Sequence, residues 1–341
     1  MDSPLWIDRH RPALDALPQA DVRTYLDRVA HGPINLLLHG PEGSGKTAAV
    51  YALAEELHTE PETDLQIINV ADFFGMTKKE IANDPRFGRF IDASQRRKSK
   101  AAMINYVLKE LAGYPPVAGD FKTILLDNAE AMREDFQQAL RRVMERHFEA
   151  TQFIIVTRQP GNVIQPIRSR CAQIPVRAPS TEEIVTVLER IVTKEDIQAD
   201  SDGLTYIAEY AEGNLRQAIM AAQTTAVAHG EITMEGAYEA LDAIGVDDQL
   251  LETLTAARDG DFSAARGTLD DLLVDEGIEG QTLLYDLLRV ARTRWGEEEV
   301  TELYELAGII DFDLVEGVND RVQLGHFLSR LAPDVETVPK N

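Results

Sequence analysis

The stretch that decides the fold is Gly40-Pro41-Glu42-Gly43-Ser44-Gly45-Lys46-Thr47. It fits the pattern G-x-x-x-x-G-K-[ST], in which glycines let backbone N–H groups turn toward phosphate oxygens. An apolar run at residues 34–38 precedes it, and a helix-forming stretch at residues 48–57 follows it. A strand, a glycine loop and a helix in this order predict an α/β domain that binds a nucleotide.

The chemistry of the loop predicts individual roles. We expect Lys46 to reach the β and γ oxygens of ATP and Thr47 to offer its hydroxyl to Mg²⁺. Residues 123–127 form an apolar run that ends in a carboxylate, so Asp127 is the predicted magnesium partner, the alternative being a cap for the next helix. Glu42 is expected to point outward. The predicted ATP-binding residues of this region are Gly40, Pro41, Glu42, Gly43, Ser44, Gly45, Lys46, Thr47 and Ala48.

Alternation of strand-like and helix-like segments predicts the domain organisation. Further strand-like runs lie at residues 65–70, 123–126 and 153–157, and helix-compatible stretches at 101–111 and 135–148 separate them. This order is typical of a parallel sheet flanked by helices. After Pro175 and Pro179 only helices are predicted, the first of them capped by Ser180. We therefore expect a P-loop domain at 1–178, a helical domain at 179–242, a second helical domain at 243–335 and a tail at 336–341.

Composition excludes several classes of protein. The chain has 341 residues and one cysteine, Cys171, so it makes no internal disulfide, and no paired Cys/His spacing predicts a zinc site. No run of eighteen apolar residues predicts a membrane span, and we expect a cytoplasmic protein. The formal net charge is −24, and nine of the basic residues are lysine. Either a host with very high internal salt, a halophile, or repulsion of polyanions would explain this acidity.

Residues 76–110 are an exception to the acidity. This basic segment holds nine basic and four acidic side chains. It is either a solvated helix face or a surface that contacts phosphates. Phe73, Phe74, Phe87 and Phe90 lie in and beside the segment, and we expect them in the core rather than at a contact with a partner protein.

Longer segments resemble one family. Residues 127–130 and 137–145 resemble the extended Walker B region of replication factor C small subunits, the AAA+ clamp loaders of archaea and eukaryotes. Residues 164–171 resemble the family's Ser-Arg-Cys motif, residues 213–219 its sensor 2 segment, and residues 6–12 the segment that borders adenine. Residues 310–317 and 322–324 resemble the last helices of its collar domain. The resemblance spans nearly the whole chain and is weakest between 71 and 120.

The resemblance implies an α/β P-loop AAA+ module followed by an α-helical lid and an α-helical clamp-loader collar. It implies a pentameric ring built with other replication factor C subunits, which acts on a sliding clamp and primer–template DNA with ATP and Mg²⁺ as cofactors. Arg170 would be the arginine finger that reaches a neighbour's γ-phosphate. Arg216 would contact the phosphates of its own subunit's nucleotide, and Arg11 and Pro12 would border the adenine. Surface salt bridges are the alternative roles of Arg170 and Arg216.

Two positions depart from the family pattern. Asn128 stands where the family has its catalytic glutamate, and an amide cannot accept a proton from the attacking water. Arg158 stands at the sensor 1 position, where the family has an asparagine, and Glu130 replaces the family's terminal aspartate of the Walker B region. We therefore expect ATP binding with weak or absent hydrolysis at the chain's own site, while Ser169 and Arg170 remain able to serve a neighbour.

Given this fold, four side chains of the basic segment are expected to track a DNA phosphate backbone by shape and charge: Arg96, Arg97, Lys98 and Lys100. Two other functions stay open. One is a stand-alone AAA+ ATPase of another DNA-repair or recombination branch, and the other is a nucleotide-stabilised scaffold that hydrolyses nothing. The collar resemblance favours the clamp loader, and Asn128 and Arg158 favour the scaffold.

Overall fold

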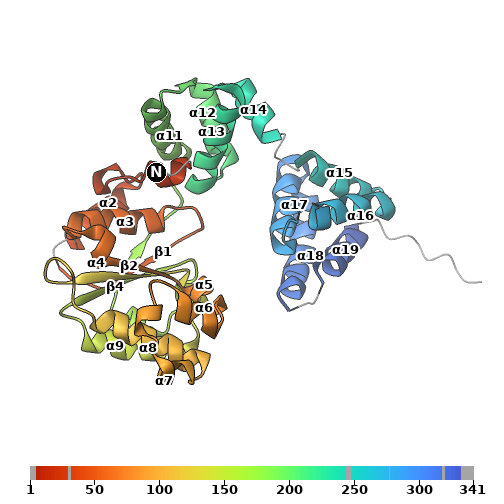
Figure 1. Ribbon diagram of the computed structural model, residues 1–341. Coiled ribbons are helices and arrows are strands. Elements are labelled where there is room, and N and C mark those ends of the chain that lie inside the picture. Colours follow the sequence, from red (N-terminus) through yellow and green to blue (C-terminus); the bar gives the residue numbers. More distant parts are fainter. Residues whose placement is uncertain (1–4, 30–31, 243–246, 276, 317–318, 332–341) are drawn as a thin grey trace, which may run out of the picture. The chain divides into compact units, whose positions relative to one another are not determined.

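The computed structural model describes the chain except for residues 1–4, 30–31, 243–246, 276, 317–318 and 332–341. The chain forms two compact units, residues 1–238 and 239–341, whose helices and strands are drawn in Figure 1. The boundary predicted at residue 243 and the tail predicted at 336–341 lie outside the described residues.

The first unit is built on a parallel five-stranded sheet with the strand order β2-β3-β4-β1-β5. Its strands are β1 (Leu36–His39), β2 (Leu65–Asn69), β3 (Lys122–Asp127), β4 (Thr151–Thr157) and β5 (Ala172–Pro175). Register pairs His39 of β1 with Thr157 of β4, and Leu126 of β3 with Ile155 of β4. The carboxyl ends of β1, β3 and β4 therefore meet at one edge, where parallel sheets commonly bind ligands.

The four predicted strands are confirmed, a fifth strand, β5, was not predicted, and the expectation that only helices follow Pro179 is wrong. β5 lies at the edge of the sheet, where Pro175 is tolerated, and only Ile174 of its four residues is fully buried. In the helical region, β6 (Gln198–Ala199) and β7 (Glu231–Ile232) form a parallel pair of two residues each. Such short segments carry no periodicity that a sequence could reveal.

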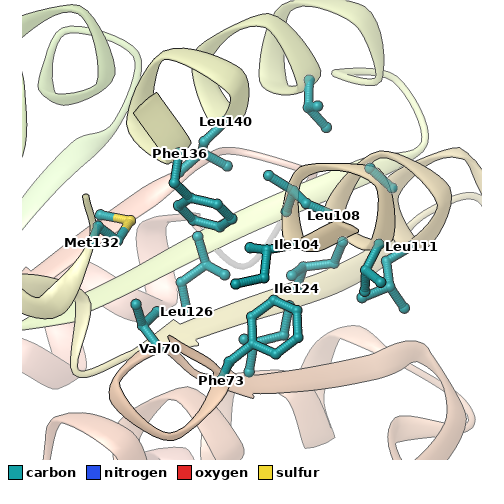
Figure 2. Close-up of a cluster of buried hydrophobic side chains, with 14 of the residues drawn as sticks. Val70, Phe73, Ile104, Leu108, Leu111, Ile124, Leu126, Met132, Phe136 and Leu140 are labelled. Carbon is teal, nitrogen blue, oxygen red and sulfur yellow. The ribbon is translucent and has the colours of Figure 1, made fainter. Parts of the chain in front are cut away.

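Helices cover both faces of the sheet because strand side chains alternate between them. On one face α8 (Lys100–Gly113) and α9 (Glu134–Arg146) bury the hydrophobic cluster shown in Figure 2, which includes Ile104, Leu108, Ile124, Leu126 and Phe136. On the other face pack α2 (Ala20–Val29) and α3 (Lys46–Leu57). The helix predicted at 101–111 is confirmed, and its apolar residues Met103, Ile104, Val107, Leu108 and Leu111 are all buried.

Short helices fill the region where the resemblance is weakest. They are α5 (Val70–Gly75), α6 (Lys78–Asn83), the 3-10 turn Gly88–Phe90 and α7 (Ala93–Arg96). Phe73 and Phe87 are fully buried with their ring centroids 4.7 Å apart, and Phe74 and Phe90 are partly buried against the same cluster. The prediction that these aromatics belong to the core is confirmed. The remaining short elements of the sheet domain are α4 (Pro61–Asp64) and α10 (Gln165–Arg168), with 3-10 turns at Leu14–Ala16, Ala129–Ala131 and Pro160–Asn162.

A helical lid belongs to the same unit. It comprises α11 (Thr181–Glu195), α12 (Ser201–Tyr210), α13 (Leu215–His229) and the first part of α14 (Met234–Asp242). The N-terminal segment, residues 6–19 with α1 (Trp6–Arg9), joins the lid to the sheet domain. The Trp6 amide donates to Gln223 Oε1 at 2.9 Å, and the Arg190 guanidinium donates to the Ala16 carbonyl at 2.9 Å. At its other end the Gln19 amide donates to the carbonyls of Ser44 and Arg177, at 2.8 and 3.0 Å.

The second unit is helical, as predicted. Its elements are α15 (Asp247–Arg258), α16 (Phe262–Asp270), a π-helical turn (Asp271–Asp275), α17 (Gly280–Arg294), α18 (Glu297–Glu316) and α19 (Asp320–Leu331). Its core consists mainly of leucine, and Phe327 is fully buried within it. Among the residues that the structure describes, no helix has the length and apolar character needed to cross a membrane.

Gly40 offers a test of the junction between β1 and the loop. Its φ is +157°, and a Cβ at this position would lie 1.9 Å from the Val176 carbonyl oxygen. We expect Gly40→Ala to lower the free energy of unfolding by about 3 kcal/mol, because the backbone that follows β5 must move. Urea unfolding measures this. The control is Gly161→Ala, where nothing lies within 4 Å of the added Cβ, and equal midpoints for the two variants would contradict the expectation.

Candidate nucleotide-binding site

A cavity of about 690 Å³ lies at the carboxyl edge of the sheet. Several parts of the first unit line it: the loop after β1, the N-terminal segment, the segments at the carboxyl ends of β2, β3 and β4, and helices α11 and α13. Of the predicted ATP-binding residues, those that line it are Arg11, Pro12, Glu42, Gly43, Gly45, Lys46, Thr47, Ala48 and Arg216. The structure thus brings together predicted residues that are up to 205 positions apart in the sequence, from Arg11 to Arg216.

The remaining loop residues hold the loop's shape. The Lys46 ammonium donates to the carbonyls of Gly40 and Pro41, at 3.0 and 2.5 Å, and the Ser44 hydroxyl donates to Pro41 at 2.9 Å. Lys46 is only 8% exposed. Burial lowers the pKa of Lys46, while the carboxylates of Asp127 and Glu130 act in the opposite direction. The ammonium therefore lies in the loop's own ring of oxygens, beside the cavity.

Thr47 and Asp127 form the part of the cavity that could hold a metal ion. The Thr47 hydroxyl donates to Asp127 Oδ2 at 3.0 Å, which places two oxygens side by side at the ends of β3 and the loop. Mg²⁺ prefers such hard oxygen ligands and commonly completes its shell with water and phosphate oxygens. The donor set therefore fits Mg²⁺. Among the described residues, no group of three or more His, Cys, Asp or Glu side chains could hold a metal ion by itself.

Asn128 follows Asp127 in an unusual backbone conformation. Its φ of 52° and ψ of 46° lie in the left-handed region, which asparagine tolerates better than most residues. Its side-chain amide donates to Asn69 Oδ1 at 3.3 Å, and Asn69 also caps the start of α5. The Asn128 side chain is thus turned toward the end of β2, and it carries no group that accepts a proton from water.

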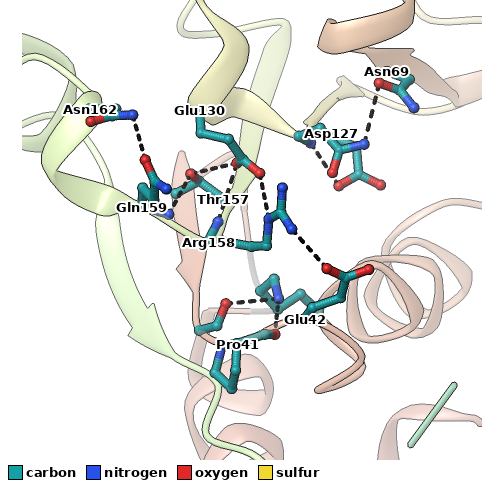
Figure 3. A network of polar contacts seen from close by, with 12 residues as sticks. Pro41, Glu42, Asn69, Asp127, Glu130, Thr157, Arg158, Gln159 and Asn162 are labelled. Atoms are coloured by element: carbon teal, nitrogen blue, oxygen red, sulfur yellow. Dashed lines mark hydrogen bonds and ion pairs between the residues drawn. The ribbon is translucent and has the colours of Figure 1, made fainter. Parts of the chain in front are cut away.

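Arg158 links two carboxylates that, like Arg158 itself, line the cavity (Figure 3). Its Nε donates to Glu130 Oε1 at 2.9 Å and its Nη1 donates to Glu42 Oε2 at 2.7 Å. Burial alone would raise the pKa of Glu130, but hydrogen bonds from its own backbone, Arg158 and Thr157 outweigh it, so the pKa is lowered. Glu42 is largely exposed, but it lines the cavity and does not simply point outward as expected. Its bond with Arg158 was not predicted, because 116 residues separate the two in the sequence.

The lid touches the loop directly. The Leu215 amide donates to the Gly43 carbonyl at 3.0 Å, and a Cβ on Gly43 would lie 1.8 Å from Asn214 Oδ1. Arg216, the next residue of α13, lines the cavity from this side. In the N-terminal segment the Arg11 guanidinium lies 4.2 Å from the centroid of the Tyr51 ring. Residues from the lid, the loop and the N-terminal segment therefore enclose one cavity.

Arg170 lies outside this cavity, after α10. Its Nη2 pairs with Glu145 Oε1 of α9 at 2.5 Å, and its Nη1 donates to the Pro166 carbonyl at 2.6 Å. The side chain remains 37% exposed, and its neighbour Ser169 is exposed as well. A guanidinium in this position cannot act on the cavity of its own subunit without leaving these partners, and it is accessible to another chain.

Cys171 is predicted to be unreactive. Burial raises the pKa of its thiol from the ordinary 9.0 to about 12, which lowers the thiolate fraction near pH 8 about a thousandfold. We expect a thiol reagent such as iodoacetamide to modify the folded chain correspondingly slowly. The same chain unfolded in guanidinium serves as the control, and equal rates in the two states would contradict the expectation.

The basic segment differs in part from the prediction. Arg96, Arg97 and Lys98 are exposed, and the Lys98 ammonium lies 5.8 Å from the centroid of the Tyr106 ring. Lys100 is half-buried instead, and its ammonium donates to the Phe74 carbonyl at 2.5 Å. The last carbonyls of α5 have no donor within the helix, so this lysine supplies one. Lys100 therefore does not share the open surface of the other three.

The sheet, the phosphate-binding loop and the helical lid define the class of protein as a P-loop ATPase of the AAA+ type. Family comparisons agree: residues 186–227 match the RCF1/5-like AAA+ ATPase lid domain, residues 247–330 the replication factor C C-terminal domain, and residues 24–180 the family described as DNA polymerase III, delta subunit. Among solved structures, RuvB from Thermotoga maritima, a Holliday junction branch migration motor, has the same fold, with a TM-score of 0.53 and 15% identity over 81% of this chain and 85% of that one.

Curated relatives define the family more closely. The replication factor C small subunit of Staphylothermus marinus is 30% identical over 96% of this chain and 94% of its own length. That of Halobacterium salinarum is 30% identical over 97% of both chains. The chain belongs to the replication factor C small-subunit family.

Proposed function

We infer that the chain is an ATP-binding subunit of a replication factor C-like clamp loader, which helps to load a sliding clamp onto primer–template DNA. The observation that carries this proposal is the single cavity in which Lys46, Thr47, Asp127 and Arg216 meet, in a chain of this family. The loop would hold the phosphates of ATP, Thr47 and Asp127 would hold Mg²⁺, and Arg11 and Pro12 would border the adenine. When bound, the ion supplies charge neutralisation at the phosphates.

Hydrolysis at the chain's own site is proposed to be weak. Asn128 cannot act as a base, and its amide is bonded to Asn69. Glu130 cannot replace it, because its carboxylate accepts hydrogen bonds from Thr157 and from Arg158. Neither the Asn128 carboxamide nor the Glu130 carboxylate is therefore available to activate a water molecule. A subunit that binds ATP and hydrolyses little remains useful to a ring, because its Arg170 can serve a neighbour's site.

Partners follow from the same proposal. Arg170, exposed and outside its own cavity, would reach the γ-phosphate held by the adjacent subunit of a hetero-oligomeric ring, which the resemblance makes a pentamer. Arg96, Arg97 and Lys98 would contact the phosphate backbone of primer–template DNA, with a contribution to affinity that falls as salt rises. Lys100 would support this surface through α5 rather than touch DNA. A non-hydrolysing scaffold is the second candidate, which Asn128 favours.

The test is ATP turnover by the purified chain, alone and mixed with sister subunits, clamp and primed DNA. Little turnover alone and brisk turnover in the mixture would support a clamp-loader subunit. Brisk turnover by the chain alone, with homo-oligomers in size-exclusion chromatography, would support a stand-alone ATPase instead. Nucleotide binding without turnover in any mixture would favour the scaffold.

A further inference from the structure

The guanidinium of Arg158 is held by two carboxylates that differ sharply in how firmly they bind it. Glu130 accepts hydrogen bonds from the Arg158 backbone amide, from Arg158 Nε and from the Thr157 hydroxyl, at 3.2, 2.9 and 2.8 Å. The Glu130 side chain is 13% exposed. Glu42 binds only Nη1, at 2.7 Å, and its side chain is 67% exposed. An exposed ion pair with a single contact is weak, so Glu42 holds Arg158 less firmly than Glu130 does. Glu130 thus anchors the arginine, and Glu42 is the exchangeable ligand.

Glu42 lies where an exchange of its contact with Arg158 would affect nucleotide binding. Glu42 lies between Gly40 and Gly43, in the loop whose backbone N–H groups would hold phosphates, and Arg158 lines the same cavity as Lys46 and Thr47. The charges of Arg158 and Glu42 are both near enough to Lys46 to act on its pKa in opposite directions. A phosphate group that enters the cavity beside Lys46 therefore meets a cation already bound to a carboxylate.

We propose that Glu42 competes with the terminal phosphate of a bound nucleoside triphosphate for Arg158. The inference rests on the proposed nucleotide binding and deepens it by assigning the residues that distinguish a triphosphate from a diphosphate. With a triphosphate, Nη1 of Arg158 leaves Glu42 for a phosphate oxygen, while Nε stays on Glu130. A diphosphate has no group at that position, so Arg158 keeps Glu42. Glu42 is thus an internal competitor that lowers affinity for the triphosphate alone.

The expected effects follow from the charges involved. Arg158→Gln removes a charge-assisted hydrogen bond to the terminal phosphate, which should weaken triphosphate binding on the order of tenfold and leave diphosphate binding unchanged. Glu42→Gln removes an exposed ion pair that must break, which should tighten triphosphate binding about two- to fivefold. In the Arg158→Gln background, Glu42→Gln should then leave triphosphate affinity unchanged, because the guanidinium for which Glu42 and the phosphate compete is absent.

The experiment is a double-mutant cycle of nucleotide binding. Equilibrium titrations with fluorescent ATPγS and fluorescent ADP, in Mg²⁺ and at one fixed salt concentration, are made on the unaltered chain, Glu42→Gln, Arg158→Gln and the double variant. Glu56→Gln and Arg28→Gln make the same charge changes at exposed positions outside the cavity and serve as matched controls. Thermal unfolding shows that each variant is folded.

Each outcome decides the proposal. Tighter ATPγS binding by Glu42→Gln that disappears in the Arg158→Gln background, with ADP affinity constant, supports competition. An equal gain in both backgrounds, or an equal gain for ATPγS and ADP, overturns it and reduces Glu42 to a general repulsion of anions. No effect of either substitution overturns it as well. If the unaltered chain binds neither nucleotide, both the proposed function and the competition fail. If Lys46→Ala abolishes nucleotide binding while Glu42→Gln and Arg158→Gln leave it unchanged, the competition alone is overturned.

Discussion

Arg170→Ala is expected to lower ATP turnover of the assembled complex at the neighbouring site about a thousandfold. An arginine supplied by another chain neutralises charge that develops on the transferred phosphoryl group, and its removal typically costs this much or more. The side chain does not line its own subunit's cavity and is 37% exposed, so binding of ATP by the altered chain should not change. Single-turnover hydrolysis in mixed complexes measures the loss.

The control for this prediction is Arg146→Ala, which removes another exposed cation beside Glu145 on α9. It should retain turnover, while size-exclusion chromatography checks that both variants still assemble. Glu145→Gln removes the charge that pairs with Arg170 but keeps an oxygen that can accept its hydrogen bond, so this variant should leave the finger in place and keep most of the activity. Full turnover by Arg170→Ala would show that the neighbour's site draws its arginine from elsewhere.

Lys46→Ala is expected to weaken ATP binding about a hundredfold. A buried ammonium that reaches phosphate oxygens contributes a strong, charge-assisted hydrogen bond. The same ammonium donates to the carbonyls of Gly40 and Pro41, so its loss also leaves two loop oxygens without a donor. Isothermal titration calorimetry with ATP and Mg²⁺ measures the change, and Lys194→Ala, an exposed lysine on the lid, is the matched control. ATP affinity equal to that of the unaltered chain would contradict the assignment of the loop.

The parts of the structure that could be predicted are those defined by short runs of adjacent residues. Lys46, Thr47 and the strand that ends at Asp127 are each defined by a few adjacent residues, so the strand–loop–helix unit and the acidic strand end could be read from the chain. Parallel pairing then brings Thr47 and Asp127 within 3.0 Å although 80 residues separate them. The general architecture, a parallel sheet with a lid and a second helical domain, was predicted for the same reason.

Contacts that depend on side-chain direction could not be predicted. Glu42, Glu130 and Arg158 belong to three separate loops, and nothing in their spacing shows that one guanidinium joins them. Lys100 was assigned to an open surface because its charge fits one. Its ammonium instead donates a hydrogen bond at the carboxyl end of α5. This helix has six residues, which is too short for a periodic pattern to predict it. The interpretation of the net charge of −24 as adaptation to salt stays a prediction.

The bonds of the N-terminal segment have a consequence for the folding of the chain. Trp6 and Ala16 are hydrogen-bonded to the lid, and Gln19 is hydrogen-bonded to the loop and to Arg177. The segment therefore joins the lid to the sheet domain, through bonds between residues up to about 200 positions apart. We therefore expect the lid and the sheet domain to unfold in one cooperative step. Residues 239–341 have a leucine core of their own, and we expect them to unfold in a separate step. The sequence predicts three domains, but we expect the chain to unfold in two cooperative steps.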